Sequence, residues 1–100
     1  MVDRIDALLD AELAEALACA DRMTRGTAEA FMAVRQPPAE VTVTFSGAIR
    51  QQCWSVSRGD GAYEVVYMPR AGYFSLCAQS VFGPLDIGVH GPALGCYGSV

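Results

Sequence analysis

The spacing of apolar residues changes from a helical period to a strand period near Glu40, and this change constrains the fold more than any other feature. From residue 3 to residue 35, apolar positions recur on one stripe when the chain advances about 100° per residue. From residue 40 to residue 90, apolar and polar residues alternate, as they do in half-buried strands. The sequence therefore predicts an α+β protein. The helical stripe contains Ile5, Leu9, Leu13, Ala16, Ala20, Met23, Thr27, Phe31 and Val34.

The helical region, residues 3–35, is predicted to be one long helix or two short ones. Asp3 suits the N-cap position, and the proline pair at 37–38 stops the helix. One unbroken helix over this range would span about 50 Å, whereas five strands side by side extend only about 24 Å. Because the overhang would be large, we favour a break near Gly26, where Thr27 can cap a second helix. A continuous helix would instead indicate dimerisation along its free end.

Five strands are expected between residues 40 and 90, separated by turns at 46–48, 58–61, 69–72 and 83–84. Connections this short join neighbouring antiparallel strands, so the sheet is predicted to be a meander. We expect the helical region to pack on one face of this five-stranded antiparallel meander, so that residues 1–100 form a single domain. Residues 91–100 are expected to be a glycine-rich tail or a short sixth strand.

Turn length decides which residues are neighbours across the strands and which face each side chain joins. If every turn holds two or four residues, the predicted pairs are Trp54 with Val65, Val65 with Leu76, Tyr67 with Phe74, and Ala78 with Val89. The face beneath the helices then collects Val41, Val43, Phe45, Trp54, Val56, Tyr63, Val65, Tyr67, Phe74, Leu76, Phe82, Leu85, Ile87 and Val89.

On the opposite face, the same register places Ser55, Glu64, Cys77 and His90 in one row, with neighbouring Cβ atoms about 4.5 to 5.5 Å apart. A cysteine beside a histidine is the minimal nucleophile–base pair, because imidazole can take the thiol proton. Cys77 and His90, with Glu64 close by, are therefore the candidates for catalysis or for a metal site. The four cysteines contain no CxxC pair, so we predict no metal and no other cofactor.

Asp86 lies four residues before His90, the only histidine, on the same side of the last predicted strand. At 3.3 Å per residue the two positions would be about 13 Å apart. Asp86 therefore cannot orient His90 unless Gly88 folds the strand.

The opposite face also carries four side chains that do not suit solvent: Val66, Met68, Tyr73 and Val81. Hydrophobic residues make up 52% of the chain, which is more than one small monomer easily hides. An apolar patch rimmed by polar groups is typical of an interaction surface. We therefore expect a non-enzymatic interaction module that binds a second copy of itself, as a homodimer, or another protein. The alternative is a small thiol-dependent enzyme, or a ligand- or metal-binding protein, using Cys77 and His90.

Charge and hydropathy argue against other partners. The net charge is −4 and the chain has no lysine, so it lacks the basic cluster that nucleic acids require. No apolar run approaches the roughly 18 to 20 residues of a membrane helix, and the acidic amino-terminal segment does not resemble a secretory signal. We expect a cytoplasmic protein with reduced thiols. The acids of the first helix are expected to form a solvated face: Asp6, Asp10, Glu12, Glu15 and Asp21.

Overall fold

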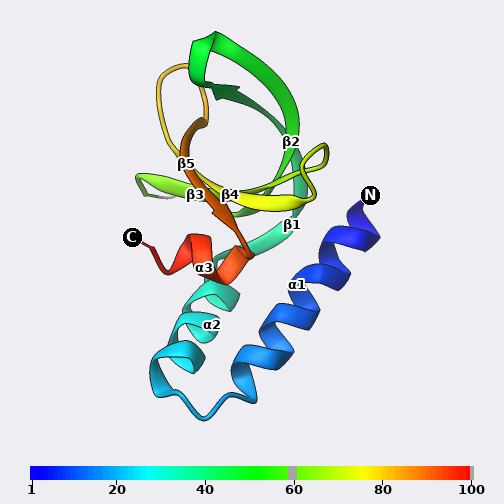
Figure 1. The fold of residues 1–100 in the computed structure, drawn as a ribbon, viewed down its shortest axis with the longest axis vertical. Coiled ribbons are helices and arrows are strands. Elements are labelled where there is room, and N and C mark those ends of the chain that lie inside the picture. Colours follow the sequence, from blue (N-terminus) through cyan, green and yellow to red (C-terminus); the bar gives the residue numbers. More distant parts are fainter. Residues whose placement is uncertain (59–60, 100) are drawn as a thin grey trace.

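The computed structural model describes residues 1–58 and 61–99, with helices at one end of its long axis and a ring of strands at the other (Figure 1). This arrangement confirms the predicted α+β fold with an antiparallel meander. No helix among the described residues is long and apolar enough to cross a membrane. In chain order the elements are α1 (Val2–Leu17), α2 (Arg22–Val34), β1 (Arg35–Phe45), η1 (Ser46–Ala48), β2 (Ile49–Ser57), β3 (Tyr63–Met68), β4 (Tyr73–Ala78), β5 (Leu85–Gly91) and α3 (Ala93–Tyr97).

The helical region is broken, but at residues 18–21 rather than near Gly26. Asp21 is the N-cap of α2, where its carboxylate accepts hydrogen bonds from the Thr24 backbone N–H at 3.1 Å and the Thr24 hydroxyl at 2.6 Å. These hydrogen bonds favour the charged carboxylate and lower the pKa of Asp21. Gly26 lies within α2, in open space. The second helix is therefore started by a side-chain cap, and the glycine does not end the first.

Arg35, at the junction of α2 and β1, fastens α1 to the base of the sheet. Its guanidinium donates to the Asp10 carboxylate at 2.8 Å and to the Asp6 carboxylate at 3.2 Å. Asp6 and Asp10 remain 41% and 69% exposed, so they face solvent as predicted and also bind this arginine.

Residues 93–97 form helix α3, which corrects the predicted tail or sixth strand. The carboxylate of Glu12, on α1, accepts hydrogen bonds from the backbone N–H groups of Ala93 and Leu94, each at 3.0 Å. The first N–H groups of a helix have no partner within the helix, so this contact stabilises a very short one. Glu12 thus joins the two ends of the chain.

The turn between β1 and β2 has three residues, Ser46–Ala48, and this odd number reverses the face of β1. Gly47 supplies the positive φ of +78° that the turn requires. The resulting register sets Val41 opposite Cys53. The prediction for this strand was wrong because it assumed an even number of turn residues. The side chains moved from beneath the helices to the other face of the sheet are Val41, Val43 and Phe45.

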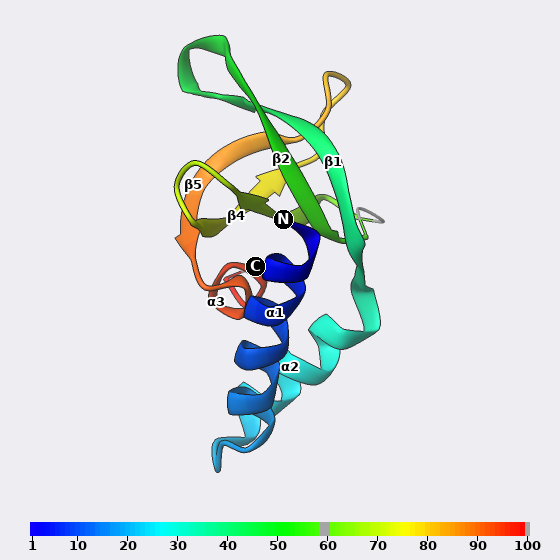
Figure 2. The same cartoon turned by 90° about the vertical axis from the view of Figure 1, so that its right-hand side faces the viewer.

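β1 also reaches β5, and this contact closes the meander into a barrel (Figure 2). Thr44 aligns with Leu85 in parallel, and the Thr44 N–H donates to the Pro84 carbonyl at 3.0 Å. Closure gives the sheet two buried faces and the protein two cores. The core between sheet and helices contains Ile5, Leu9, Leu13, Ala16, Ala28, Phe31, Val56, Val65, Tyr67, Phe74, Leu76, Ala93 and Cys96. The core inside the barrel contains Val43, Cys53, Val66, Met68 and Cys77, with Val41 and Phe45 partly buried against it.

The other strand pairs keep the predicted faces but not always the predicted partners. The pairs Val65 with Leu76 and Tyr67 with Phe74 are confirmed. Trp54 lies opposite Tyr67 rather than Val65, because the connection from β2 to β3 is longer than assumed. Ala78 lies opposite Leu85 rather than Val89. Three residues assigned to the core are exposed instead: Tyr63, Phe82 and Ile87.

Candidate functional site

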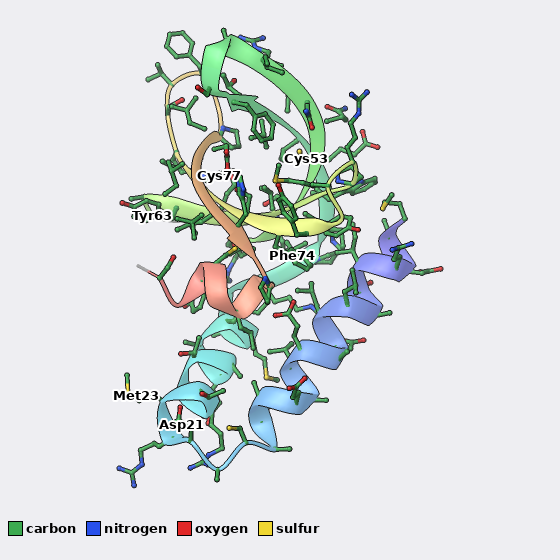
Figure 3. The ribbon with its side chains drawn as sticks, viewed as in Figure 1. Asp21, Met23, Cys53, Tyr63, Phe74 and Cys77 are labelled. Carbon is green, nitrogen blue, oxygen red and sulfur yellow. The ribbon has the colours of Figure 1, made fainter. Side chains whose placement is uncertain are left out.

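The candidate site residues lie on the face of the sheet that turns into the barrel. Figure 3 shows Cys53 and Cys77 within the ring of strands and Phe74 toward the helices. Glu64 is opposite Cys77, as predicted. His90, however, is opposite Ser75, and Asp86 takes the position beside Cys77. The predicted contact between Cys77 and His90 is therefore wrong.

A bulge in β5 brings Asp86 and His90 together. Cys77 pairs with Asp86 and the preceding Leu76 pairs with Val89, so β5 has two residues more than β4 at this point. One of them, Gly88, has a φ of +83°. The strand is therefore folded at Gly88, which is the condition that the sequence set for a contact between Asp86 and His90. His90 Nε2 accordingly lies 3.0 Å from Asp86 Oδ1 and 3.1 Å from Oδ2.

Two residues of β4 complete this cluster, and sequence reasoning did not find them. The Ser75 hydroxyl donates a hydrogen bond to Asp86 Oδ1. The Tyr73 ring stacks on the His90 ring, with centroids 5.1 Å apart and planes inclined by 23°. The available signal was the segment from Asp86 to His90 with a glycine at its centre, which indicates a bulge facing the neighbouring strand.

The order of these groups does not suit nucleophilic catalysis. In a serine hydrolase the histidine lies between serine and acid, so that it can remove the hydroxyl proton. Here Asp86 lies between Ser75 and His90, and the hydroxyl proton is directed at the carboxylate. Ser75 is also fully buried. The cluster therefore fixes the shape of β5 and offers no accessible nucleophile.

Glu64 is 7% exposed and is held by a second polar cluster at the barrel wall. Its carboxylate accepts hydrogen bonds from the Ser55 hydroxyl at 2.5 Å and from the Gln79 amide at 2.7 Å. Gln36, in turn, donates to the Ser55 oxygen at 3.2 Å. Among the described residues, every buried side-chain nitrogen and oxygen has a hydrogen-bond partner. The hydrogen bonds of these buried polar groups are thus made within the protein, without a ligand.

The thiols are poor nucleophiles in this setting. Burial, with the nearby Asp86 and Glu64 carboxylates, raises the pKa of Cys77 to about 12. Burial and Asp86 raise the pKa of Cys53 to about 11. A nucleophilic cysteine needs the opposite shift, because the thiolate is the reactive form. Cys77 is moreover fully buried.

A metal ion finds no ligand set in the part of the chain that the structure describes. No group of three or more histidine, cysteine, aspartate or glutamate side chains there could hold one. Asp86 and His90 offer only two ligands, and each already binds the other.

The four residues predicted to form an interaction surface separate into two kinds. Val66 and Met68 lie inside the barrel, so neither contributes to a surface. They were misplaced because an open sheet would expose the face that closure buries. Tyr73 and Val81 remain exposed, and Val81 is 93% accessible.

Val81 belongs to a group of exposed apolar side chains at the end of the barrel opposite the helices, which we name the apolar tip. Phe82 follows Val81 in the loop between β4 and β5 and is 77% exposed. Ile49, at the end of the β1–β2 hairpin, is 58% exposed, and Ile87 is 43% exposed. Figure 1 shows the loop and the hairpin end at the extremity farthest from α1 and α2. The apolar tip comprises the exposed apolar residues of that hairpin end and that loop: Ile49, Val81 and Phe82.

A cavity of about 220 Å³ lies where α2, α3 and the start of β3 meet. Val34, Val65, Leu76 and Tyr97 form its apolar walls, and its polar neighbours Ser57, Arg58 and Glu64 already have partners. It therefore presents mainly apolar surface.

In comparisons with known proteins, no family model, no curated protein and no solved structure matches this chain.

The raised pKa of Cys77 predicts a loss of stability in alkali. Above pH 9.0, the ordinary thiol pKa, the unfolded chain ionises Cys77, whereas the folded chain keeps it protonated up to about pH 12. The folded state then binds more protons, so the free energy of unfolding falls as pH rises, by up to about 1.4 kcal/mol per pH unit for this thiol. This stabilisation is fully present below pH 9.0 and is lost between pH 9.0 and about 12.

Urea unfolding of the wild type and Cys77→Ala at a series of pH values measures this effect. The substitution removes packing at every pH, so the slopes are compared rather than the absolute stabilities. The wild-type slope should be the steeper one above pH 9.0. Parallel curves would contradict the burial of this thiol.

The bulge in β5 predicts opposite effects of alanine at two glycines. At both Gly88 and Gly26 an added Cβ would meet no atom within 4 Å, so backbone conformation decides the outcome. Gly88→Ala should lower the free energy of unfolding by about 1 to 2 kcal/mol, because its φ is left-handed. Gly26→Ala, inside α2, should raise it by about 0.5 to 1 kcal/mol. Equal effects in denaturant unfolding would show that β5 is not folded at Gly88.

Proposed function

We propose that the protein is a non-enzymatic interaction module that associates with itself as a homodimer. The observation that carries this proposal is the apolar tip, where Val81 and Phe82 are 93% and 77% exposed. Val81 and Phe82 are neighbours in one loop, and exposed apolar side chains that lie together are typical of an interaction surface. Single exposed apolar side chains need no such explanation.

The pairing of the chemically active groups supports a binding role over catalysis. Asp86 and His90 hold each other, and Glu64 is held by Ser55 and Gln79. The thiol of Cys77 is buried and its pKa is raised. Of the titratable groups among these only His90 is exposed, and the Ser75 hydroxyl is directed at Asp86 rather than at His90, so no hydroxyl or thiol nucleophile is aligned with the imidazole. The interior groups instead stabilise the barrel.

The distribution of charge favours a protein partner over nucleic acid. The chain has seven arginines and no lysine, and the arginines are scattered along the sequence from Arg4 to Arg70. A nucleic-acid surface gathers basic side chains on one face or along one helix. Apolar contact is therefore the main attraction this surface offers.

The thiols support a cytoplasmic location, which is part of the proposal. All four cysteines are free, and three of them are buried: Cys53, Cys77 and Cys96. Free buried thiols suit a reducing compartment, where disulfides are rare.

Light scattering during gel filtration tests the proposal. The protein is loaded over a range from about 1 to about 100 µM, which covers moderate and weak affinities. We expect the measured mass to rise from the 10.6 kDa of the monomer toward twice that value as concentration increases. A mass of 10.6 kDa at every concentration would refute self-association.

A further inference from the structure

Helix α3 lies between the ring of strands and α2 and takes no part in the pairing of the strands (Figure 1). Ala93 and Cys96 are its fully buried side chains, whereas Leu94 and Tyr97 are half-buried. The two buried side chains are small, so covering them stabilises the closed position only modestly. A helix much shorter than about 12 to 15 residues is also not stable by itself. Contacts with neighbouring elements must therefore hold α3 in place.

The packing around α3 is incomplete. Four hollows border it in the part of the chain that the structure describes: Tyr97 lines two of them, and Leu94 lines the other two. One of the pair at Tyr97 is the cavity of about 220 Å³. Thr27, on the facing side of α2, lines two of the four. Atoms beside a hollow lack contact partners on that side, so moving α3 breaks less packing than moving a strand of the barrel.

The carboxylate of Glu12 is the main polar attachment of α3. Its two oxygens accept hydrogen bonds from the backbone N–H groups of Ala93 and Leu94, each at 3.0 Å. Hydrogen bonds to a charged acceptor are about twice as strong as those between neutral groups. The Cys96 thiol lies 3.5 Å from two backbone carbonyls of the sheet, but a thiol is a weak donor. Loss of the Glu12 carboxylate should therefore loosen α3 more than any other single change of a polar group.

Gly91 lets the chain turn between β5 and α3. Its φ is +141°, a conformation that is open to glycine because it has no Cβ. A Cβ built there would meet no atom within 4 Å, so no packing restrains this junction. Rotation at Gly91 can thus move α3 while β5 stays paired with β4.

We propose that α3 is a lid that opens as a unit at Gly91 while the barrel stays folded, and that Glu12 holds it closed. Small proteins open locally where buried apolar contacts are few, at a lower free energy than global unfolding requires. Opening takes the Tyr97 ring away from the Phe31 ring, whose centroid is 5.4 Å away in the closed form. It also removes one wall of the cavity, which then joins the hollow along α2. The lid thereby controls access to an apolar groove, and it does so independently of the proposed self-association.

Thiol labelling distinguishes opening of the lid from unfolding of the barrel. Cys96 lies on α3 and is 1% exposed, whereas Cys77 lies inside the barrel and is 0% exposed. Burial, with the Glu12 and Asp86 carboxylates nearby, raises the pKa of Cys96 to about 11, so the closed form does not react near neutral pH. Iodoacetamide labelling followed by peptide mass spectrometry measures both rates in one sample. We expect Cys96 to be labelled at least about tenfold faster than Cys77.

Substitution of Glu12 tests what holds the lid. Glu12→Ala should speed the labelling of Cys96 about tenfold and leave that of Cys77 unchanged, because two N–H groups of α3 lose their acceptor. Glu12→Gln keeps one acceptor oxygen and should have a smaller effect. Glu15→Ala is the matched control, since it removes an exposed carboxylate three residues further along α1 and should leave both rates unchanged.

Hydrogen exchange provides a second readout that does not depend on the acidity of the thiol. The Gly98 N–H donates to the Leu94 carbonyl at 2.9 Å in the closed form, and its exchange should quicken in Glu12→Ala by the same factor as the labelling of Cys96. Faster labelling without faster exchange would assign the effect to thiol acidity and contradict the lid.

The remaining outcomes are equally decisive. Equal labelling rates of Cys96 and Cys77 in the wild type would show that α3 opens only when the whole chain unfolds. A Glu12→Ala variant in which Cys77 is accelerated as much as Cys96 would show a general loss of stability. Either result would overturn the lid. An unchanged rate for Cys96 in Glu12→Ala, or an equal acceleration in Glu15→Ala, would refute the role of Glu12.

Discussion

The closing contact between β1 and β5 is the constraint on which the rest of the structure depends, and it acts together with the three-residue turn Ser46–Ala48. Successive side chains of a strand point to opposite faces, so one residue more or less in a turn exchanges the faces of the next strand. Here the odd turn directs Val43 away from the helices and toward Val66 and Met68. The sheet thereby gains a second apolar face, which an open sheet would leave in water. Closing the barrel buries that face and pairs β1 with β5 at Thr44 and Leu85.

Closure also decides what the polar residues can do. Inside a barrel a carboxylate or a hydroxyl is costly unless it is hydrogen-bonded. Glu64 and Asp86 each meet this requirement with neighbouring side chains, and the same environment keeps the Cys77 thiol protonated. The residues with the most reactive chemistry therefore belong to the architecture. Val81 and Phe82 are two adjacent large apolar side chains that the fold leaves 93% and 77% exposed, and this is why we propose the apolar tip as the interaction surface.

The local parts of the fold could be predicted from the sequence, and the non-local parts could not. The apolar stripe through Ile5, Leu9 and Leu13 identifies α1, and tight turns fix the pairs of β3 with β4. A helix break was predicted, but its position was wrong because Asp21 and Gly26 are both plausible end signals, and only the Thr24 hydrogen bonds decide between them. The parity of the first hairpin was missed because an even turn was assumed, although the turn signal at 46–48 itself spans three residues. The surface was misplaced for another reason: Val66 and Met68 appeared exposed because the sheet was predicted to be open. Within the candidate site, the proximity of Glu64 to Cys77 was predictable from the register. The hydrogen bond from the Ser75 hydroxyl to Asp86 was not, because it depends on a bulge in β5 that no periodic pattern shows.

The closed barrel is tested most directly by nuclear Overhauser effects from the methyl groups of Val43. In the barrel these methyls share a core with Val66 and Met68, so cross-peaks to those two side chains are expected. In an open sheet with β1 beneath the helices, the same methyls would lie near Phe31 and Val65 of the other core. Cross-peaks from Val43 to Phe31, with none to Val66, would contradict the barrel, the burial of the thiols and the placement of the apolar tip.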